Sequence, residues 1–241
     1  MINNSELKYI QSFAHKKHWA EESAFIVEGP KMVQELLNSQ WTIKKIYATA
    51  DWIQVQGVLP IPVVEIDQLM LERLSLMPSP HQVIALAEKA SFLKQIPFED
   101  TFTLLLDGIQ DPGNLGTIIR TADWFGIKQI LVSEDTADFY NPKVLQSTMG
   151  SCFRVRIESV NLEHVLSKNK LEVYGAVLNG ASMFESKIAR TGFLMIGNES
   201  KGVSKDLTKY ITHPIRIPKY GQAESLNAAV ATGVLLAHWK A

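Results

Sequence analysis

Short runs of apolar residues alternate along this chain with longer segments in which apolar residues recur every three or four positions. The short runs predict buried strands, and the longer segments predict amphipathic helices. In the N-terminal part, the expected strands are residues 24–28, 44–49, 62–66 and 82–88, and the expected helices are residues 5–18, 30–38 and 67–76. This alternation predicts a small α/β unit of about 90 residues.

The same kind of pattern restarts after a break that contains Pro97. We therefore expect a first domain at 1–92, a linker at 93–100 and a second domain at 101–241. In the second domain, the expected strands are residues 102–107, 128–132, 153–157, 171–178, 193–197 and 212–217, and the expected helices are residues 114–125, 142–148, 161–169, 204–209 and 225–239. Alternation of this kind predicts a largely parallel sheet covered by helices on both faces.

The stretch Leu104–Arg120, LLLDGIQDPGNLGTIIR, reads as a strand, a turn and the start of a helix. The turn from Asp107 to Gly113 is rich in glycine, proline and aspartate, and Asn114 stands where a helix N-cap is expected. Proteins of the α/β class bind ligands at such junctions, where the carboxyl end of a strand faces a helix N-terminus. An ordinary βα turn is the competing interpretation.

Two known phosphate-binding motifs fail at this turn. Gly108 and Gly113 have the glycine spacing of a P-loop, but Asn114 and Leu115 occupy the positions of the lysine and the serine or threonine. The GxGxxG pattern of dinucleotide-binding folds is also absent. The turn therefore disfavours a nucleotide hydrolase and a dinucleotide-dependent enzyme.

Two later strands end in comparable loops. The apolar strand expected at 193–197 runs into a polar loop that contains Gly197 and Glu199. The strand expected at 212–217 is followed by a loop that contains a glycine and then by Ser225, a candidate N-cap. Each loop alone fits a purely structural role. Because a parallel sheet brings its strand carboxyl ends to one edge, the three loops together predict a ligand site.

Composition narrows the class of protein. Hydrophobic residues make up 46% of the chain and charged residues 20%, which is typical of a globular protein. The net charge of −1 argues against broad electrostatic capture of nucleic acid but allows a local basic patch. No apolar run is long enough for a membrane span, and the N-terminus lacks a signal-peptide pattern.

The single cysteine, Cys152, excludes an internal disulfide and favours a cytoplasmic protein. It lies in an apparent strand, SCFRVRI, and we expect a small core residue there rather than a nucleophile. The six histidines show no metal-ligand spacing with cysteine or carboxylates, so we expect no metal.

The expected first helix ends in basic residues, Lys16 and Lys17, followed by Trp19. One interpretation is a solvated helix end whose cations complement the helix dipole. The other is a phosphate-contacting edge with an aromatic ring for stacking.

Three motifs in the second half resemble those of the SpoU/TrmH-type RNA ribose 2′-O-methyltransferases of the SPOUT superfamily. They are NLGTIIR at 114–120, LMIGNESKG at 194–202, and IP at 217–218 with SLN at 225–227. The front half, with Lys16-Lys17 and FIVEGP at 25–30, is similar to the RNA-binding domain that often precedes this catalytic domain.

The resemblance implies a parallel sheet with a deep trefoil knot, preceded by a small ribosomal-protein-like α/β domain. It implies a homodimer with a shared active site, and S-adenosylmethionine as the cofactor. The cofactor is expected on the knot loops, held largely by backbone groups. These loops contain Leu178, Asn179, Gly180, Ile196, Gly197, Asn198, Glu199, Ile217, Pro218, Ser225, Leu226 and Asn227.

The resemblance also implies catalytic residues. Arg120 is expected to hold the target phosphate or ribose and to stabilise the forming alkoxide, because a guanidinium keeps its proton too tightly to act as the base. The residues expected to orient Arg120, the hydroxyl and the loops are Asn114, Glu199, Ser225 and Asn227. Lys16, Lys17 and Arg120 are the expected RNA-binding residues.

Departures from the family pattern affect the RNA-binding half. Trp19 stands where an arginine is expected, and Val83 stands where relatives commonly have a glycine. We expect ribosomal RNA as the substrate because of the two-domain layout, with transfer RNA as the second choice. A family member that binds structured RNA without modifying it is the competing class, and the intact catalytic set argues against it.

Overall fold

The computed structural model describes residues 2–89 and 97–240. The chain forms two compact units, of which the first comprises Met1–Ser91 with Tyr140–Phe153 and the second comprises Phe92–Phe139 with Arg154–Ala241. Most of the linker expected at 93–100 lies outside the described residues. The segment Tyr140–Phe153, which the sequence pattern assigned to the second domain, groups with the first unit.

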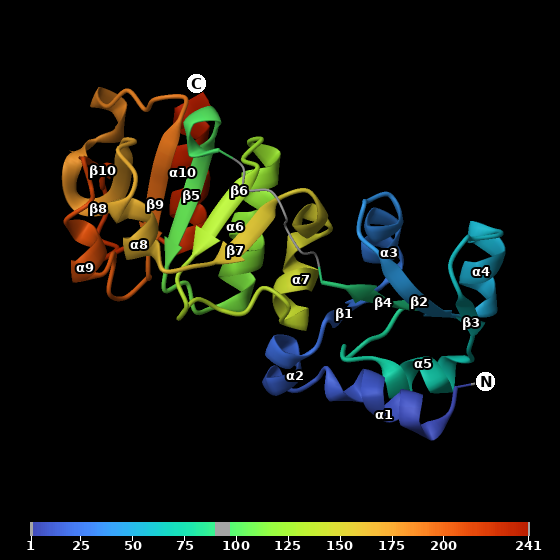
Figure 1. The fold of residues 1–241 in the computed structure, drawn as a ribbon. Helices are drawn as coiled ribbons and strands as arrows, with labels where there is room; N and C mark the ends of the chain where they lie inside the picture. The colour runs from blue at the N-terminus through green and yellow to red at the C-terminus, as the bar shows by residue number, and fades with distance from the viewer. Residues whose placement is uncertain (1, 90–96, 241) are drawn as a thin grey trace. The chain divides into compact units, whose positions relative to one another are not determined.

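The first unit is built on a four-stranded mixed sheet (Figure 1). Its strands, in the sheet order β1-β4-β2-β3, are β1 (Ala24–Glu28), β4 (Val83–Glu88), β2 (Ile43–Ala48) and β3 (Val63–Glu65). Strand β4 is antiparallel to β1 and β2, and β3 is parallel to β2. The helices are α1 (Asn4–Ser12), α2 (Lys16–Glu21), α3 (Pro30–Leu37), α4 (Ala50–Gln56), α5 (Gln68–Leu74) and α7 (Pro142–Thr148).

The single helix expected at 5–18 is wrong, because the structure has two helices there. Leu7, Ile10 and Phe13 give α1 its buried face, and that stripe ends at Phe13. The polar residues that follow have no core contact to keep the helix going, and the chain turns through an extended His15 before α2 begins. Lys16 and Lys17 therefore lie in the first turn of α2, not at the end of a longer helix.

Helix α4 was not expected from the sequence. Trp52 is its only buried residue, so the segment shows no apolar stripe of helical period.

The second unit contains a six-stranded sheet in which every strand pair is parallel, as the sequence pattern predicted. The sheet order is β10-β8-β9-β5-β6-β7. The strands are β5 (Phe102–Asp107), β6 (Gln129–Val132), β7 (Arg156–Ser159), β8 (Val173–Ser182), β9 (Gly192–Gly197) and β10 (His213–Arg216), and the helices are α6 (Pro112–Trp124), α8 (Leu162–Ser167), α9 (Lys205–Thr208) and α10 (Ala228–Lys240).

Helices cover both faces of this sheet (Figure 1). On one face, Leu105 and Met195 of the central strands pack with Leu162 of α8 and Leu207 of α9. On the other face, α6 and α10 pack against each other, and α10 contacts β9. All strand carboxyl ends consequently meet at one edge, as the sequence analysis assumed.

The strand expected at 153–157 starts later than predicted. Strand β7 begins at Arg156, and Cys152 lies in a short 3₁₀ turn, Ser151–Phe153, where it is buried. None of the described helices combines the length and the hydropathy that a membrane span requires.

Candidate active site

The carboxyl end of β5 is connected to two neighbouring strands through the peptide groups of Gly108. Its N–H donates to Ser133 Oγ after β6 at 2.8 Å, and its carbonyl accepts from Asn198 Nδ2 after β9 at 2.7 Å. Gly108 adopts φ +68°, and a Cβ there would lie 3.1 Å from Asp135 Oδ2. The positive φ therefore favours glycine at this position, and a Cβ would also press against the side chain of Asp135.

The loop after β9 is a tight hairpin that carries Glu199. The hairpin is closed by hydrogen bonds in both directions between the backbones of Asn198 and Gly202, at 3.1 and 2.8 Å. At its far end, the Ser204 N–H donates to the carboxylate of Asp107 at 2.7 Å. With the Asn198 contact to Gly108, both ends of the hairpin are fixed to the end of β5, so Glu199 has a defined position.

Helix α6 begins two residues earlier than expected, and Asn114 is not its N-cap. Asp111 is the cap, because its carboxylate accepts from the Asn114 N–H at 2.8 Å, and Pro112 occupies the first helical position. Asn114 is the third residue of the helix, so its side chain is free for contacts across the site.

That side chain joins the three strand-end loops. Asn114 Nδ2 donates to Glu199 Oε1 at 2.6 Å, and Asn114 Oδ1 accepts from Asn227 Nδ2 at 2.9 Å. Asn227 Oδ1 in turn accepts from the Ala229 N–H at 2.9 Å, at the start of α10. We call Asn114, Glu199 and Asn227 the Asn114 cluster.

The expectation that Ser225 is the N-cap of α10 is wrong. Helix α10 starts at Ala228, and Asn227 makes the capping contacts. Ser225 is exposed, two residues upstream.

Arg120 lies outside the Asn114 cluster. It is exposed on α6, six residues after Asn114, which corresponds to about 240° around the helix and roughly 9 Å along it. Among the described residues, no hydrogen bond or ion pair joins Arg120 to Asn114, Glu199 or Asn227. The expectation that these residues orient Arg120 is therefore not met within one chain.

Two of the loops expected to hold a cofactor lie at β8 and after β10. His213 and Pro214 pair with Tyr174 and Gly175, but Ile215 pairs with Ala181, so residues 176–180 bulge out of the ladder.

A Cβ on Gly180 would come within 2.6 Å of the backbone of Pro214, and Arg216 Nε donates to the Gly180 carbonyl at 3.0 Å. On the bulge, Leu178 is 75% exposed.

The loop from Ile217 to Leu226 has unused backbone groups. In the part of the chain that the structure describes, the backbone of residues 217–226 forms no hydrogen bond with another backbone group. Exposed Leu178 and Leu226 lie on two of the expected cofactor loops. Free peptide groups can hydrogen-bond the polar edge of a ligand, and exposed leucines can contact its flat apolar face. An adenosine has both features.

The remaining expected cofactor residues lie at the ends of strands or just beyond them. Ile196 is buried in β9, and Gly197 pairs with Asp107. A Cβ on Gly197 would come within 2.2 Å of the Gly202 backbone, so only glycine lets the hairpin fold back. Asn179 is exposed on the bulge. No group of three or more histidine, cysteine or acidic residues in the described ranges could hold a metal.

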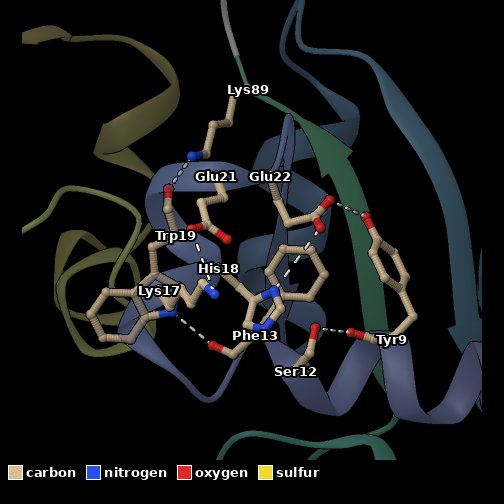
Figure 2. Close-up of polar contacts among 9 residues, drawn as sticks. All are labelled: Tyr9, Ser12, Phe13, Lys17, His18, Trp19, Glu21, Glu22 and Lys89. Atoms are coloured by element: carbon tan, nitrogen blue, oxygen red, sulfur yellow. Dashed lines mark hydrogen bonds and ion pairs between the residues drawn. The ribbon is translucent and has the colours of Figure 1, made fainter.

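The basic edge lies in the first unit (Figure 2). Trp19 is half-buried, and its indole N–H donates to the Phe13 carbonyl at 2.7 Å, which fastens α2 to the end of α1. Tyr9 OH adds a second tie by donating to Glu22 at 3.1 Å, and burial together with this carboxylate raises the pKa of Tyr9 to about 12. Trp19 thus has a structural role, whereas Lys16 and Lys17 are exposed.

The family follows from comparison with known proteins. Residues 101–237 match the model of the SpoU rRNA Methylase family, and residues 4–85 match an MRM3-like substrate binding domain. The chain belongs to the SpoU rRNA methylase family. The three motifs on which the sequence analysis relied all lie within the first match.

Relatives match this member of the family over almost its whole length. It is 33% identical over 98% of its length to the Bacillus subtilis 23S rRNA (guanosine(2553)-2′-O)-methyltransferase RlmP, covering 96% of that protein. The structure of a TrmH-family RNA methyltransferase from Porphyromonas gingivalis superposes with a TM-score of 0.90 at 34% identity, over 99% of this chain and 98% of the other. The structure of an AdoMet-bound rRNA methyltransferase from Sinorhizobium meliloti superposes with a TM-score of 0.85 at 28% identity, over 100% of this chain and 95% of the other.

Sequence reasoning missed several residues that position the site. Asp107 and Asp111 were interpreted only as turn residues, and Ser133 was not singled out, but each accepts a hydrogen bond that fixes a loop. The proline at 112 was the available signal for Asp111, because proline favours the first helical position and an N-cap residue precedes that position.

We predict that Asn114→Asp destabilises the protein at pH 7. The substitution replaces the amide that donates to Glu199 with a second carboxylate at hydrogen-bonding distance, which costs about 1–3 kcal/mol. The deficit relative to the unsubstituted protein should shrink in acid, where the two carboxylates share a proton. Urea unfolding at pH 7 and at about pH 4.5 measures both effects.

The matched control is Asn114→Asp combined with Glu199→Gln, which restores one amide and one carboxylate. This double variant should recover most of the stability at pH 7. Equal stability of Asn114→Asp and the unsubstituted protein would show that the contact contributes nothing.

Proposed function

We propose that this chain methylates the 2′-hydroxyl of a ribose in ribosomal RNA with S-adenosylmethionine as the methyl donor. The observation that carries the proposal is the Asn114 cluster, in which one residue from each of the three family motifs meets at the carboxyl edge of a parallel sheet. The full-length similarity to a 23S rRNA 2′-O-methyltransferase supports the reaction and the substrate. A cytoplasmic location is part of the proposal, supported by the bacterial origin of that relative.

The cofactor loops fit S-adenosylmethionine. The backbone of Ile217, Pro218, Ser225 and Leu226 would supply hydrogen bonds, and Leu178 would supply apolar contact. The AdoMet-bound structures of relatives support this choice of ligand. When bound, the cofactor supplies an electrophilic methyl group on a sulfonium. Asn179, Gly180, Ile196, Gly197 and Asn198 complete the proposed binding loops.

The protein's contribution to the reaction is alignment and charge. The ribose hydroxyl must face the methyl group and lose its proton during the attack. Arg120 holds the target phosphate or ribose and stabilises the developing negative charge on the hydroxyl oxygen. The Asn114 cluster, with Ser225 beside it, keeps the loops around the two reactants in place. The carboxylate of Glu199 is the only charged group in that cluster.

The trefoil knot is part of the proposal. The segment after β8 passes over the end of α10, where Ser186 O lies 3.1 Å from His238 Nε2 and the Trp239 indole N–H donates to the Ala189 carbonyl at 2.9 Å. A segment that crosses the last helix in this way supports threading of the C-terminal part of the chain through an earlier loop.

The proposed active unit is a homodimer. Helices α6 and α10 pack together, and each exposes a large apolar residue: Trp124 is 84% exposed and Val230 is 53% exposed. Trp124 lies one helical turn beyond Arg120 on the exposed side of α6. A second copy covering this side would bring Arg120 to the Asn114 cluster of the partner, which accounts for the separation of the two within one chain.

The N-terminal domain, 1–92, is proposed to bind RNA through Lys16 and Lys17. Both lysines lie in the first turn of α2, where positive charge opposes the helix dipole. The helix dipole therefore does not account for these lysines, although Lys17 lies 3.9 Å from Glu21 in an exposed i,i+4 pair that fits a solvated helix end. Their exposure and charge support an RNA phosphate as the partner. Residues 93–100 and 101–241 are proposed as the linker and the catalytic domain.

The first prediction here concerns Arg120→Ala. Methyl transfer should fall by about 10²–10³-fold, because a charge-stabilising group is lost, while S-adenosylmethionine binds as before. A tritiated methyl assay on unmodified total RNA measures the transfer, and calorimetry measures cofactor binding. Resistance to alkaline cleavage maps the modified nucleotide.

Two results would overturn the proposal. Loss of cofactor binding in Arg120→Ala would contradict the role of Arg120. If the unsubstituted protein binds the cofactor and RNA but transfers no labelled methyl group to RNA, the chain is a family member that binds RNA without modifying it.

The second prediction tests the shared site by mixing two inactive variants, Arg120→Ala and Asn227→Ala. Half of the dimers in an equilibrated mixture are mixed, and each has one intact site if Arg120 acts across the interface. Activity should return to about a quarter of the unsubstituted level. Mixing with no recovery would place Arg120 and the Asn114 cluster in the same chain's site.

The third prediction concerns Lys16→Glu combined with Lys17→Glu. RNA binding should weaken and its salt dependence should fall, while cofactor affinity is unchanged. The new charges suit a helix N-terminus, whereas Lys17→Glu replaces the exposed Lys17–Glu21 pair with two like charges, so the melting temperature should change little. Filter binding at several salt concentrations measures the effect, and unchanged RNA affinity at moderate salt would refute the assignment.

A further inference from the structure

Tyr220 stands out among the side chains around the proposed site. It is 90% exposed, in the loop between β10 and α10, and Lys219 beside it is exposed as well. The residues that follow, from Gly221 to Glu224, are mostly small or polar. A tyrosine ring exposed to this degree lacks the burial that usually stabilises an aromatic side chain.

Both ends of this loop are fixed at the site. At the start, Arg216 donates to the Gly180 carbonyl, and at the end Asn227 donates to Asn114. Tyr220 follows Arg216 by four residues, so its backbone lies within about 14 Å of that anchor. The ring is therefore presented next to the expected cofactor loops.

The pairing with Lys219 decides which ligand suits this ring. Single-stranded or flipped-out nucleotides are recognised by stacking on aromatic side chains and by cations on the phosphates. S-adenosylmethionine carries no phosphate, and an apolar protein surface would gain nothing from an exposed lysine. A nucleobase with its phosphate uses both side chains.

We propose that Tyr220 stacks on a base of the RNA next to the methylated ribose and that Lys219 contacts an adjacent phosphate. This inference rests on the proposed function, since it needs RNA at the site. It assigns substrate recognition to Lys219 and Tyr220, which lie between the motif residues of this loop.

The test compares Tyr220→Ala with Tyr220→Trp in the full chain. Affinity for unmodified 23S rRNA transcribed in vitro, measured by filter binding, should fall about fivefold to a hundredfold in Tyr220→Ala and be kept in Tyr220→Trp. In the methyl-transfer assay, Tyr220→Ala should raise the KM for RNA, and its Kd for S-adenosylmethionine should equal that of the unsubstituted protein. Phe184→Ala, another exposed aromatic position of the same unit, is the matched control and should leave RNA affinity unchanged.

Three outcomes would overturn the inference. Unchanged RNA affinity in Tyr220→Ala would remove the stacking role. A weaker Kd for S-adenosylmethionine would assign the ring to the cofactor, and a changed oligomeric state in light scattering would assign it to a second copy. Because RNA affinity is measured without turnover, failure of methyl transfer in the unsubstituted protein is a separate result, which refutes the proposed function.

Discussion

The amide of Asn114 is the contact on which the arrangement of the site depends. It donates to Glu199 and accepts from Asn227, so one side chain on α6 fixes the loops after β9 and before α10. An amide is suited to this because it donates and accepts at the same time. Without it, the Glu199 carboxylate and the Nδ2 group of Asn227 would lose the partner that each has at the centre of the site.

The glycines make this contact possible. Gly108 lets the chain turn at the end of β5 with a positive φ. Gly197 lets the hairpin fold back over it, because a Cβ there would lie 2.2 Å from the backbone of Gly202. Asp107 and Asn198 then hold the hairpin at both ends. Glu199 reaches Asn114 because the backbone around it is already fixed, which is the preorganisation that a methyl-transfer site needs.

The sequence predicted the parallel sheet and the convergence of three loops, because strand periodicity and the parallel-sheet rule are enough for both. It did not predict which side chains meet. Asn114 was taken for a cap because the cap and the third helical residue differ by three positions, and only the hydrogen bond of Asp111 decides between them. The side of α6 on which Arg120 lies depends on which face of the helix is buried in the fold. A linear motif does not contain that information.

A double-mutant cycle on kcat/KM for RNA methylation, with Glu199→Ala and Asn227→Ala, tests most directly whether the three loops act as one unit. These residues do not contact each other in the described hydrogen-bond network, so any coupling passes through Asn114. We predict that the double variant loses little more activity than the worse single variant, and that the coupling vanishes when Asn114 is alanine. Losses that simply add in free energy would contradict the account.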